Sequence, residues 1–151
     1  GMSSEYVEVR VLLRSLTEKM SSSGNNLNGH DISSSLYGLR GMSSKYAEVR
    51  ELFRVLSQKV LSSSANLSGQ GISNALYGLR GMSSEYVEVR EMLHALSEKI
   101  SSSSCDLGGQ GIGSALYGLR GMSSAYIEVR ELVGALTQKV SSSGCDLDSQ
   151  A

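Results

Sequence analysis

The stretch ALYGLRGMSSEYVEVRE, residues 75–91, decides the fold, because close copies of it begin forty residues earlier, at Ser35, and forty residues later, at Ala115. The string Gly-Met-Ser-Ser recurs in the same register, at Gly1, Gly41, Gly81 and Gly121. Self-similarity at a period of this length is typical of repeat proteins, in which each unit packs on its neighbours. We therefore describe residues 1–151 as a single repeat array, with repeats 1–40, 41–80 and 81–120 and a partial repeat 121–151.

The first half of each repeat predicts an amphipathic helix. In the first repeat the apolar side chains follow steps of three and four residues, at Tyr6, Val9, Leu12, Leu13, Leu16 and Met20. This spacing places them on one helical face. We expect Ser3 to cap the start of the helix, with Met2 and Val7 forming a hydrophobic staple. The helix should end near the serine cluster 21–23, where Gly24 tolerates a left-handed backbone.

The second half of each repeat predicts a shorter helix, with Ile32, Leu36 and Leu39 on one face. Asn28 is expected to be its N-cap and Asp31 the acid of a capping box. Gly41 should close it. Neither helix can bury its apolar face alone, and about 40 residues are marginal for an independent core. The sequence therefore predicts an all-α fold, an α-solenoid of 40-residue helix-turn-helix repeats with seven helices, whose right-handed superhelix is expected by analogy with other helical-hairpin repeats.

The end of the array is expected to be open. The last helix, near residues 123–141, has no second helix to follow it. Half the cover should be missing from its apolar stripe, which consists of Ile127, Val129, Leu132, Val133 and Leu136. An uncovered stripe of this kind favours end-to-end association.

Charge and composition limit the function. The chain carries 14 basic and 15 acidic residues, a net charge of −1, so no overall field attracts nucleic acid or an acidic membrane. No apolar run approaches the roughly 18 residues of a membrane span, and no signal peptide is visible. Cys105 and Cys145 lie one repeat apart, too far for a disulfide, so both thiols should be free. We expect a soluble, intracellular protein.

The second helices resemble a known family. The strings LSGQGISNALYGL (67–79) and LGGQGIGSALYGL (107–119), each preceded by a helix of the type VRELFRVLSQKV (49–60), resemble octotricopeptide repeats. The match rests on Gln70, Ile72, Asn74, Leu76, Tyr77 and Leu79. The chain departs from the family in lacking proline and in carrying tyrosine where tryptophan is usual. The family forms helical-hairpin solenoids associated with RNA in organelles, so the resemblance implies RNA binding and an organellar location. Armadillo and HEAT repeats follow similar logic and mostly bind proteins.

Two surfaces are candidates for RNA binding. The first is a ladder of basic residues on the longer helices, matched to a phosphate backbone and made of Arg10, Arg14, Arg50, Arg54, Arg90, His94 and Arg130. The alternative is that these residues pair with glutamates of the same or a neighbouring repeat, such as Glu48 and Glu51.

The second candidate surface lies on the shorter helices. Gln70, Asn74 and Tyr77 fall at i, i+4 and i+7, and an amide beside an aromatic ring can hold one base. The equivalent positions in the other repeats are His30, Ser34, Tyr37, Gln110, Ser114 and Tyr117. The alternative is that the tyrosines fill the gap between repeats, with each hydroxyl reaching a backbone group.

The sequence carries no constellation typical of an enzyme. The pair His30 and Asp31 occurs in one repeat and has no nucleophile motif beside it. The two histidines and two cysteines have no metal-site spacing. We therefore expect no catalytic residue, no metal and no cofactor. The expected function is a binding module for single-stranded RNA; the alternative is a protein–protein interaction scaffold.

Overall fold

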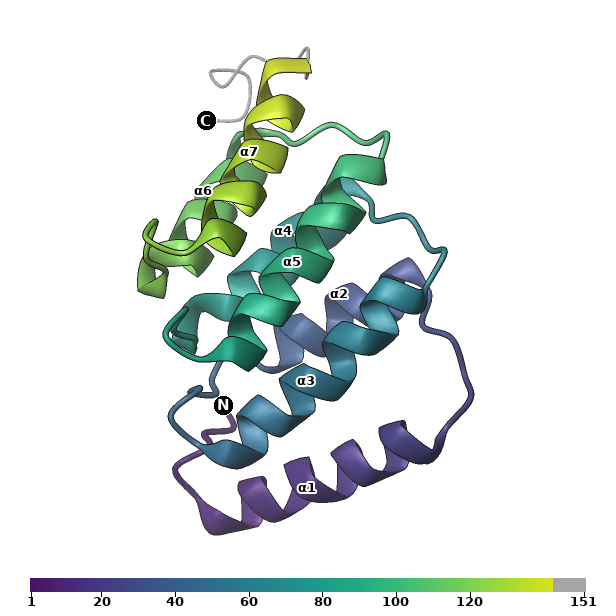
Figure 1. The fold of residues 1–151 in the computed structure, drawn as a ribbon, viewed down its shortest axis with the longest axis vertical. Helices are drawn as coiled ribbons and strands as arrows, with labels where there is room; N and C mark the ends of the chain where they lie inside the picture. Colours follow the sequence, from purple (N-terminus) through teal and green to yellow (C-terminus); the bar gives the residue numbers. More distant parts are fainter. Residues whose placement is uncertain (143–151) are drawn as a thin grey trace.

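The computed structural model describes residues 1–142, which contain seven α-helices, two short 3-10 helices and no strand (Figure 1). The α-helices are α1 (Val7–Ser22), α2 (Gly29–Gly38), α3 (Ala47–Ser62), α4 (Gly69–Tyr77), α5 (Val87–Ser102), α6 (Gly109–Gly118) and α7 (Ile127–Ser142). The 3-10 helices are η1 (Gly78–Gly81) and η2 (Leu119–Gly121). Over these residues the predicted all-α class and the seven predicted helices are confirmed.

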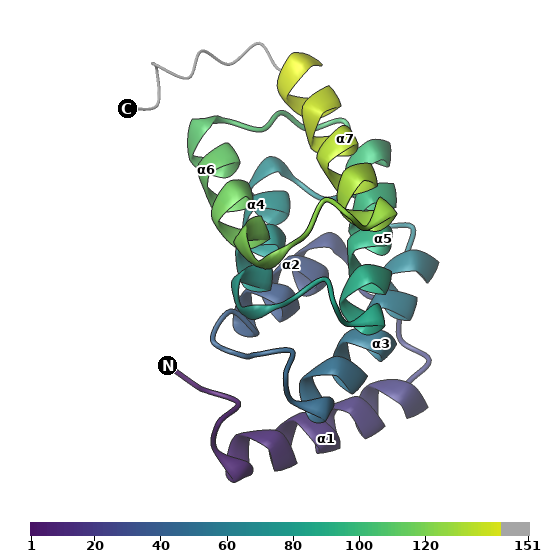
Figure 2. The same cartoon turned by 60° about the vertical axis from the view of Figure 1, so that its left-hand side comes forward.

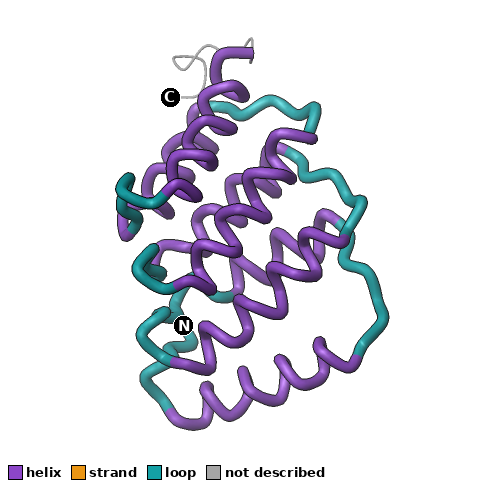
Figure 3. The backbone as a smooth tube through the Cα atoms, viewed as in Figure 1, coloured by secondary structure: helices purple, strands orange, loops and turns teal. Residues whose placement is uncertain are grey.

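The helices form two layers. The longer helices α1, α3, α5 and α7 pack side by side in that order, and α2, α4 and α6 form a second row behind them (Figures 1 and 2). The loops that connect one row to the other lie at the ends of the helices (Figure 3). We call the first row the odd layer and the second the even layer. No helix in the described residues is long and apolar enough to cross a membrane.

The core lies between the two layers. Phe53, Leu76 and Leu93 are fully buried in it, as the apolar spacing predicts. The first helix differs from α3 and α5, because α1 has a neighbour in its layer on one side only. Leu12 therefore remains 44% exposed.

The last helix is covered in part. Val129 and Leu132 are 5% and 0% exposed, because α5 packs on this side of α7. Ile127 and Val133 are 56% and 48% exposed, and Leu136 is half-buried. The stripe that the sequence predicts to lack half its cover is thus divided between a packed side and an open side.

The predicted cap of the first helix is wrong. Tyr6 is the N-cap residue of α1, and no side chain caps the helix there. Ser4, before the helix, connects two repeats instead: its hydroxyl oxygen accepts a hydrogen bond of 2.9 Å from the backbone N–H of Ser43. The same bond recurs between later repeats, from Ser83 to Ser44 and from Ser123 to Ser84. In α2, by contrast, the predicted capping box of Asn28 and Asp31 is present.

The recurring glycines serve close packing. No residue in the described part of the chain has a positive φ, so the left-handed backbone predicted at Gly24 is wrong, and α2 ends at Gly38, not at Gly41. A Cβ atom on Gly81 would lie 2.0 Å from the backbone oxygen of Met42 in the preceding repeat. A Cβ on Gly78 would lie 2.0 Å from the backbone oxygen of Leu36. Only glycine allows the backbones of neighbouring repeats to approach this closely.

Candidate functional site

The first arginine of each odd-layer helix is bound to its own chain. The Arg50 Nη1 donates hydrogen bonds of 2.8 Å to the backbone oxygens of both Ser44 and Lys45, in the loop before α3. Its guanidinium carbon lies 4.6 Å from the ring centre of Tyr86 in the next repeat. Arg10 and Arg90 make the equivalent carbonyl bonds and lie over Tyr46 and Tyr126. Arg130 makes the same carbonyl bonds, and no tyrosine ring lies under it within the described residues.

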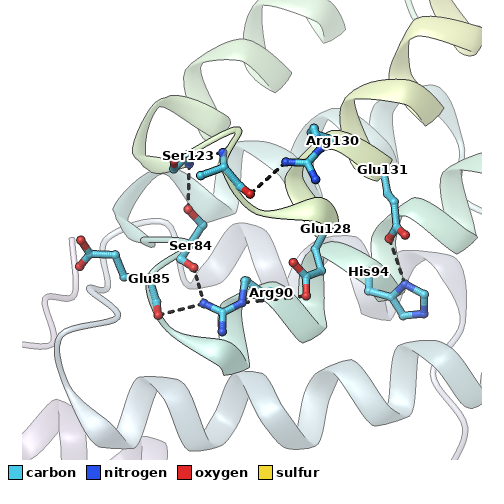
Figure 4. A network of polar contacts seen from close by, with 9 residues as sticks. Ser84, Glu85, Arg90, His94, Ser123, Glu128, Arg130 and Glu131 are labelled. Carbon is cyan, nitrogen blue, oxygen red and sulfur yellow. Dashed lines mark hydrogen bonds and ion pairs between the residues drawn. The ribbon is translucent and has the colours of Figure 1, made fainter.

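This arrangement makes the arginines joints between repeats. In Figure 4 Arg90 reaches the backbone of Ser84 and Glu85 on one side and approaches Glu128 of the next repeat on the other. The cation–π contact and the two carbonyl bonds together fix the loop, the helix and the neighbouring repeat.

In α1, α3 and α5 the second basic residue is paired with an acid, whereas α7 has Gly134 at this position. Arg14 lies 3.0 Å from Glu48, and His94 lies 3.5 Å from Glu131 (Figure 4). Arg54 pairs with Glu51 on its own helix at 2.5 Å and lowers the pKa of that carboxyl below its usual value. The pKa of Glu48 is lowered first by a bond to its own backbone N–H and then by Arg14. For Arg14, Arg54 and His94, the pairing with glutamates that the sequence offers as an alternative to phosphate binding is therefore present.

The outer face of the even layer brings several predicted residues together. Gln70 and Asn74 of α4 and Gln110 and Ser114 of α6 line one cleft of about 370 Å³. The Gln70 Nε2 donates a 3.1 Å hydrogen bond to the Asn74 Oδ1, so the two amides form one polar surface. Ser34 lies on α2 beside His30, 3.3 Å away, outside the lining of this cleft.

The tyrosines of the even layer stack on one another. The ring centres of Tyr37 and Tyr77 are 5.8 Å apart, and those of Tyr77 and Tyr117 are 5.6 Å apart. Tyr37 and Tyr117 remain 38% and 47% exposed, so the rings form a surface rather than a core. The Tyr77 hydroxyl accepts a hydrogen bond from Arg80.

Three further arginines were missed by the sequence reasoning. Arg40, Arg80 and Arg120 lie 4.3, 4.9 and 4.2 Å from the ring centres of the tyrosines three residues before them. The sequence does contain a signal for them, the string Tyr-Gly-Leu-Arg in every complete repeat. The tight turn after each short helix brings the tyrosine at i and the arginine at i+3 together. We call the six residues Tyr37, Tyr77, Tyr117, Arg40, Arg80 and Arg120 the tyrosine–arginine row.

The row differs from the odd layer in its electrostatics. In the described residues no carboxylate lies within ion-pair distance of its three arginines. Within residues 1–142 the row is therefore a line of cations without acidic partners, in which Arg40 and Arg80 each donate one hydrogen bond to a backbone oxygen.

Metal binding and cysteine chemistry were the other possible functions of side chains within residues 1–142. No group of three or more histidine, cysteine, aspartate or glutamate side chains there could hold a metal ion. Cys105 is a half-buried free thiol, as predicted, and Cys145 lies outside the described residues. Comparison of the chain with protein-family models, with curated proteins and with solved structures found no match.

Proposed function

We propose that the chain is an α-solenoid of 40-residue helix-turn-helix repeats that acts as a binding module without catalytic activity. The forty-residue period of the sequence supports this architecture. So does the return of the same joints at that period, such as the serine hydrogen bonds and the arginine–tyrosine contacts between neighbouring repeats. A right-handed superhelix follows by analogy with other helical-hairpin repeats.

The proposed ligand is single-stranded RNA, bound along the even layer. The observation that carries this proposal is the tyrosine–arginine row, whose arginines have no acidic partner in the described part of the chain. Guanidinium groups suit phosphate, exposed tyrosine rings suit unstacked bases, and the amides of Gln70, Asn74 and Gln110 suit base edges. The resemblance to octotricopeptide repeats points to the same ligand and to an organelle.

The proposed affinity is modest and sensitive to salt. Three arginines neutralise at most about three phosphates, so the logarithm of the binding constant should fall with the logarithm of salt concentration with a slope of about −2. The net charge of −1 adds no general attraction for nucleic acid.

Titration of labelled single-stranded RNA at two salt concentrations tests this proposal. The variant Arg40→Ala with Arg120→Ala removes two charges from the row. The matched control, Arg14→Ala with Arg54→Ala, removes two exposed charges from the odd layer. We expect the first variant to lose most binding and to reduce the salt slope by about 1.4, and the control to keep both. Equal losses in the two variants would contradict the proposed surface.

A protein scaffold is the second candidate, and one observation favours it. An apolar cleft of about 260 Å³ lies between α6 and α7, lined by Leu107, Leu119, Val133 and Val140 among others. At its rim Leu116 is 68% exposed, and large exposed apolar residues in a cleft suit a protein partner. If the native chain binds no RNA at low salt and a purified protein partner binds it but not the Leu116→Glu variant, the scaffold function holds instead.

A further inference from the structure

We propose that copies of this chain associate head to tail, with α1 of one copy packing on α7 of another as α5 packs on α3 inside the chain. The proposed partner is thus a second copy. This goes beyond ligand binding, because the contact uses the odd layer and leaves the even layer free.

The exposed side of α1 carries the same apolar residues as the buried side of α3. Leu12 and Leu16 are each 44% exposed. Their equivalents in α3, Leu52 and Leu56, are 4% and 1% exposed, because α1 packs against them. The side of α1 that faces away from the chain thus presents the residues that α3 presents to α1.

The exposed side of α7 is the other half of the same contact. Val133 is 48% exposed, whereas its equivalent Leu93 in α5 is fully buried. Thr137 is exposed as well, whereas its equivalent Ser97 is 6% exposed. Burying both ends against each other would remove apolar surface from water at no cost to the fold.

Each end of the chain also carries one residue of the arginine–tyrosine contact that joins neighbouring repeats, without the other residue. Tyr6 is 64% exposed, while its equivalents lie under the arginines of the preceding repeat, as Tyr46 lies under Arg10. At the other end no ring lies over Arg130 within the described residues, although Arg90 covers Tyr126. Head-to-tail packing brings Tyr6 of one copy to Arg130 of the other.

The charges at the joint argue for the same arrangement. Inside the chain, His94 pairs with Glu131 of the next repeat. At the His94 position the last repeat has Gly134, and at the Glu131 position the first repeat has Val11. Gly134 of one copy and Val11 of another face each other only in a head-to-tail contact. In that contact both members of the ion pair equivalent to His94–Glu131 are absent together. Loss of one member alone would leave an unpaired charge in the joint.

Sedimentation of the full chain tests the proposal. We expect the mass to rise above 16.1 kDa with concentration. Leu16→Glu blocks one end and Val133→Glu the other, so each variant alone should sediment as a monomer, with association weakened at least tenfold. An equimolar mixture of the two should form a species of twice the chain mass, because each keeps the end that the other lacks. Leu61→Glu, a change at an interior leucine that is 47% exposed, should associate like the native chain.

Three results would overturn the proposal: a native chain that is monomeric at every concentration, association of either blocked variant alone, or a mixture that stays monomeric. A second pair of variants uses residues that the interior repeats already carry at these positions and so preserves folding. Val11→Glu or Gly134→Arg alone should weaken association, and the two together in one chain should restore it. Failure of the double variant to associate better than either single one would also contradict a head-to-tail joint.

Discussion

Arginine lies over tyrosine in both layers of the molecule, but the two layers differ in what else the arginine touches. In the odd layer Arg50 lies over Tyr86 of the next repeat while donating to two carbonyl oxygens. In the even layer Arg120 lies over Tyr117 of its own helix end, and both residues are exposed. In the odd layer the arginine is therefore part of a joint, because its Nη1 is bound to two backbone oxygens. In the even layer Arg40 and Arg80 each donate to one backbone oxygen, and the Arg120 guanidinium has no hydrogen bond within the described residues, so this pair is the candidate ligand surface.

The largest expected effect concerns the packing that brings the even-layer rings together. Gly78→Ala places a methyl group 2.0 Å from the Leu36 oxygen, so α2 and α4 must separate and the stack of Tyr37 and Tyr77 must open. We expect a loss of about 3 kcal/mol in the free energy of unfolding, measured in urea.

Gly38→Ala is the matched control, because a Cβ there meets no atom within 4 Å. This change should be neutral or stabilise the chain by up to about 1 kcal/mol. Equal effects of the two changes would mean that the close approach does not hold the even layer together.

The second effect compares the loss of an arginine that joins two repeats with the loss of an arginine on the even-layer surface. Arg50→Ala removes two charged hydrogen bonds and one cation–π contact, and should lower the free energy of unfolding by about 2 kcal/mol. Arg120→Ala removes a contact at the surface and should change it by no more than about 0.5 kcal/mol. Urea unfolding of both variants measures the difference. Similar losses in the two would erase the distinction between the layers.

A smaller effect is expected in the cleft. Asn74→Ala should reduce the affinity for the preferred base about fivefold, about 1 kcal/mol, because one base-edge hydrogen bond is lost. Competition between short RNAs that differ at one base measures this change. Ser34→Ala, outside the cleft, should leave the preference as it is. A cleft that reads bases would be contradicted by an unaltered preference in Asn74→Ala.

The smallest effect concerns the paired acids of the odd layer. Arg14→Ala should move the pKa of Glu48 part of the way back up, since its own backbone bond still lowers it. A carboxyl with a lowered pKa stabilises the fold above its ordinary pKa, and this contribution disappears as pH falls through the lowered value. Because the pair is exposed, the effect on stability should be slight. Carboxyl titration by NMR should give an unchanged Glu51 as internal control.

Much of the fold follows from the sequence, because helix spacing and caps are local properties. The apolar steps predict the buried side of each interior helix, and Asn28 with Asp31 forms the expected capping box. Ser3 does not cap α1, because the helix begins only after Tyr6. The neighbouring Ser4 hydroxyl is engaged by another repeat, a contact that no local pattern carries. The sequence predicts glycine as a helix terminator, whereas Gly81 is needed for the close approach of the Met42 backbone.

The candidate site was only half predictable for a similar reason. A residue recurs every forty positions whether it joins repeats or faces a ligand, so Arg50 and Arg80 give the same signal in the sequence. Their roles separate only when the neighbours in space are known. The amides Gln70, Asn74 and Gln110 were found because their helical spacing places them on one face.

The most direct test follows the arginine Nε–Hε signals by NMR while single-stranded RNA is added. We expect the signals of Arg40, Arg80 and Arg120 to shift with a common affinity. The signals of Arg10, Arg50, Arg90 and Arg130 should stay in place, because each of these guanidinium groups donates to two backbone oxygens of the loop before its helix. Shifts confined to the odd-layer arginines, or no shift at any arginine, would contradict the account.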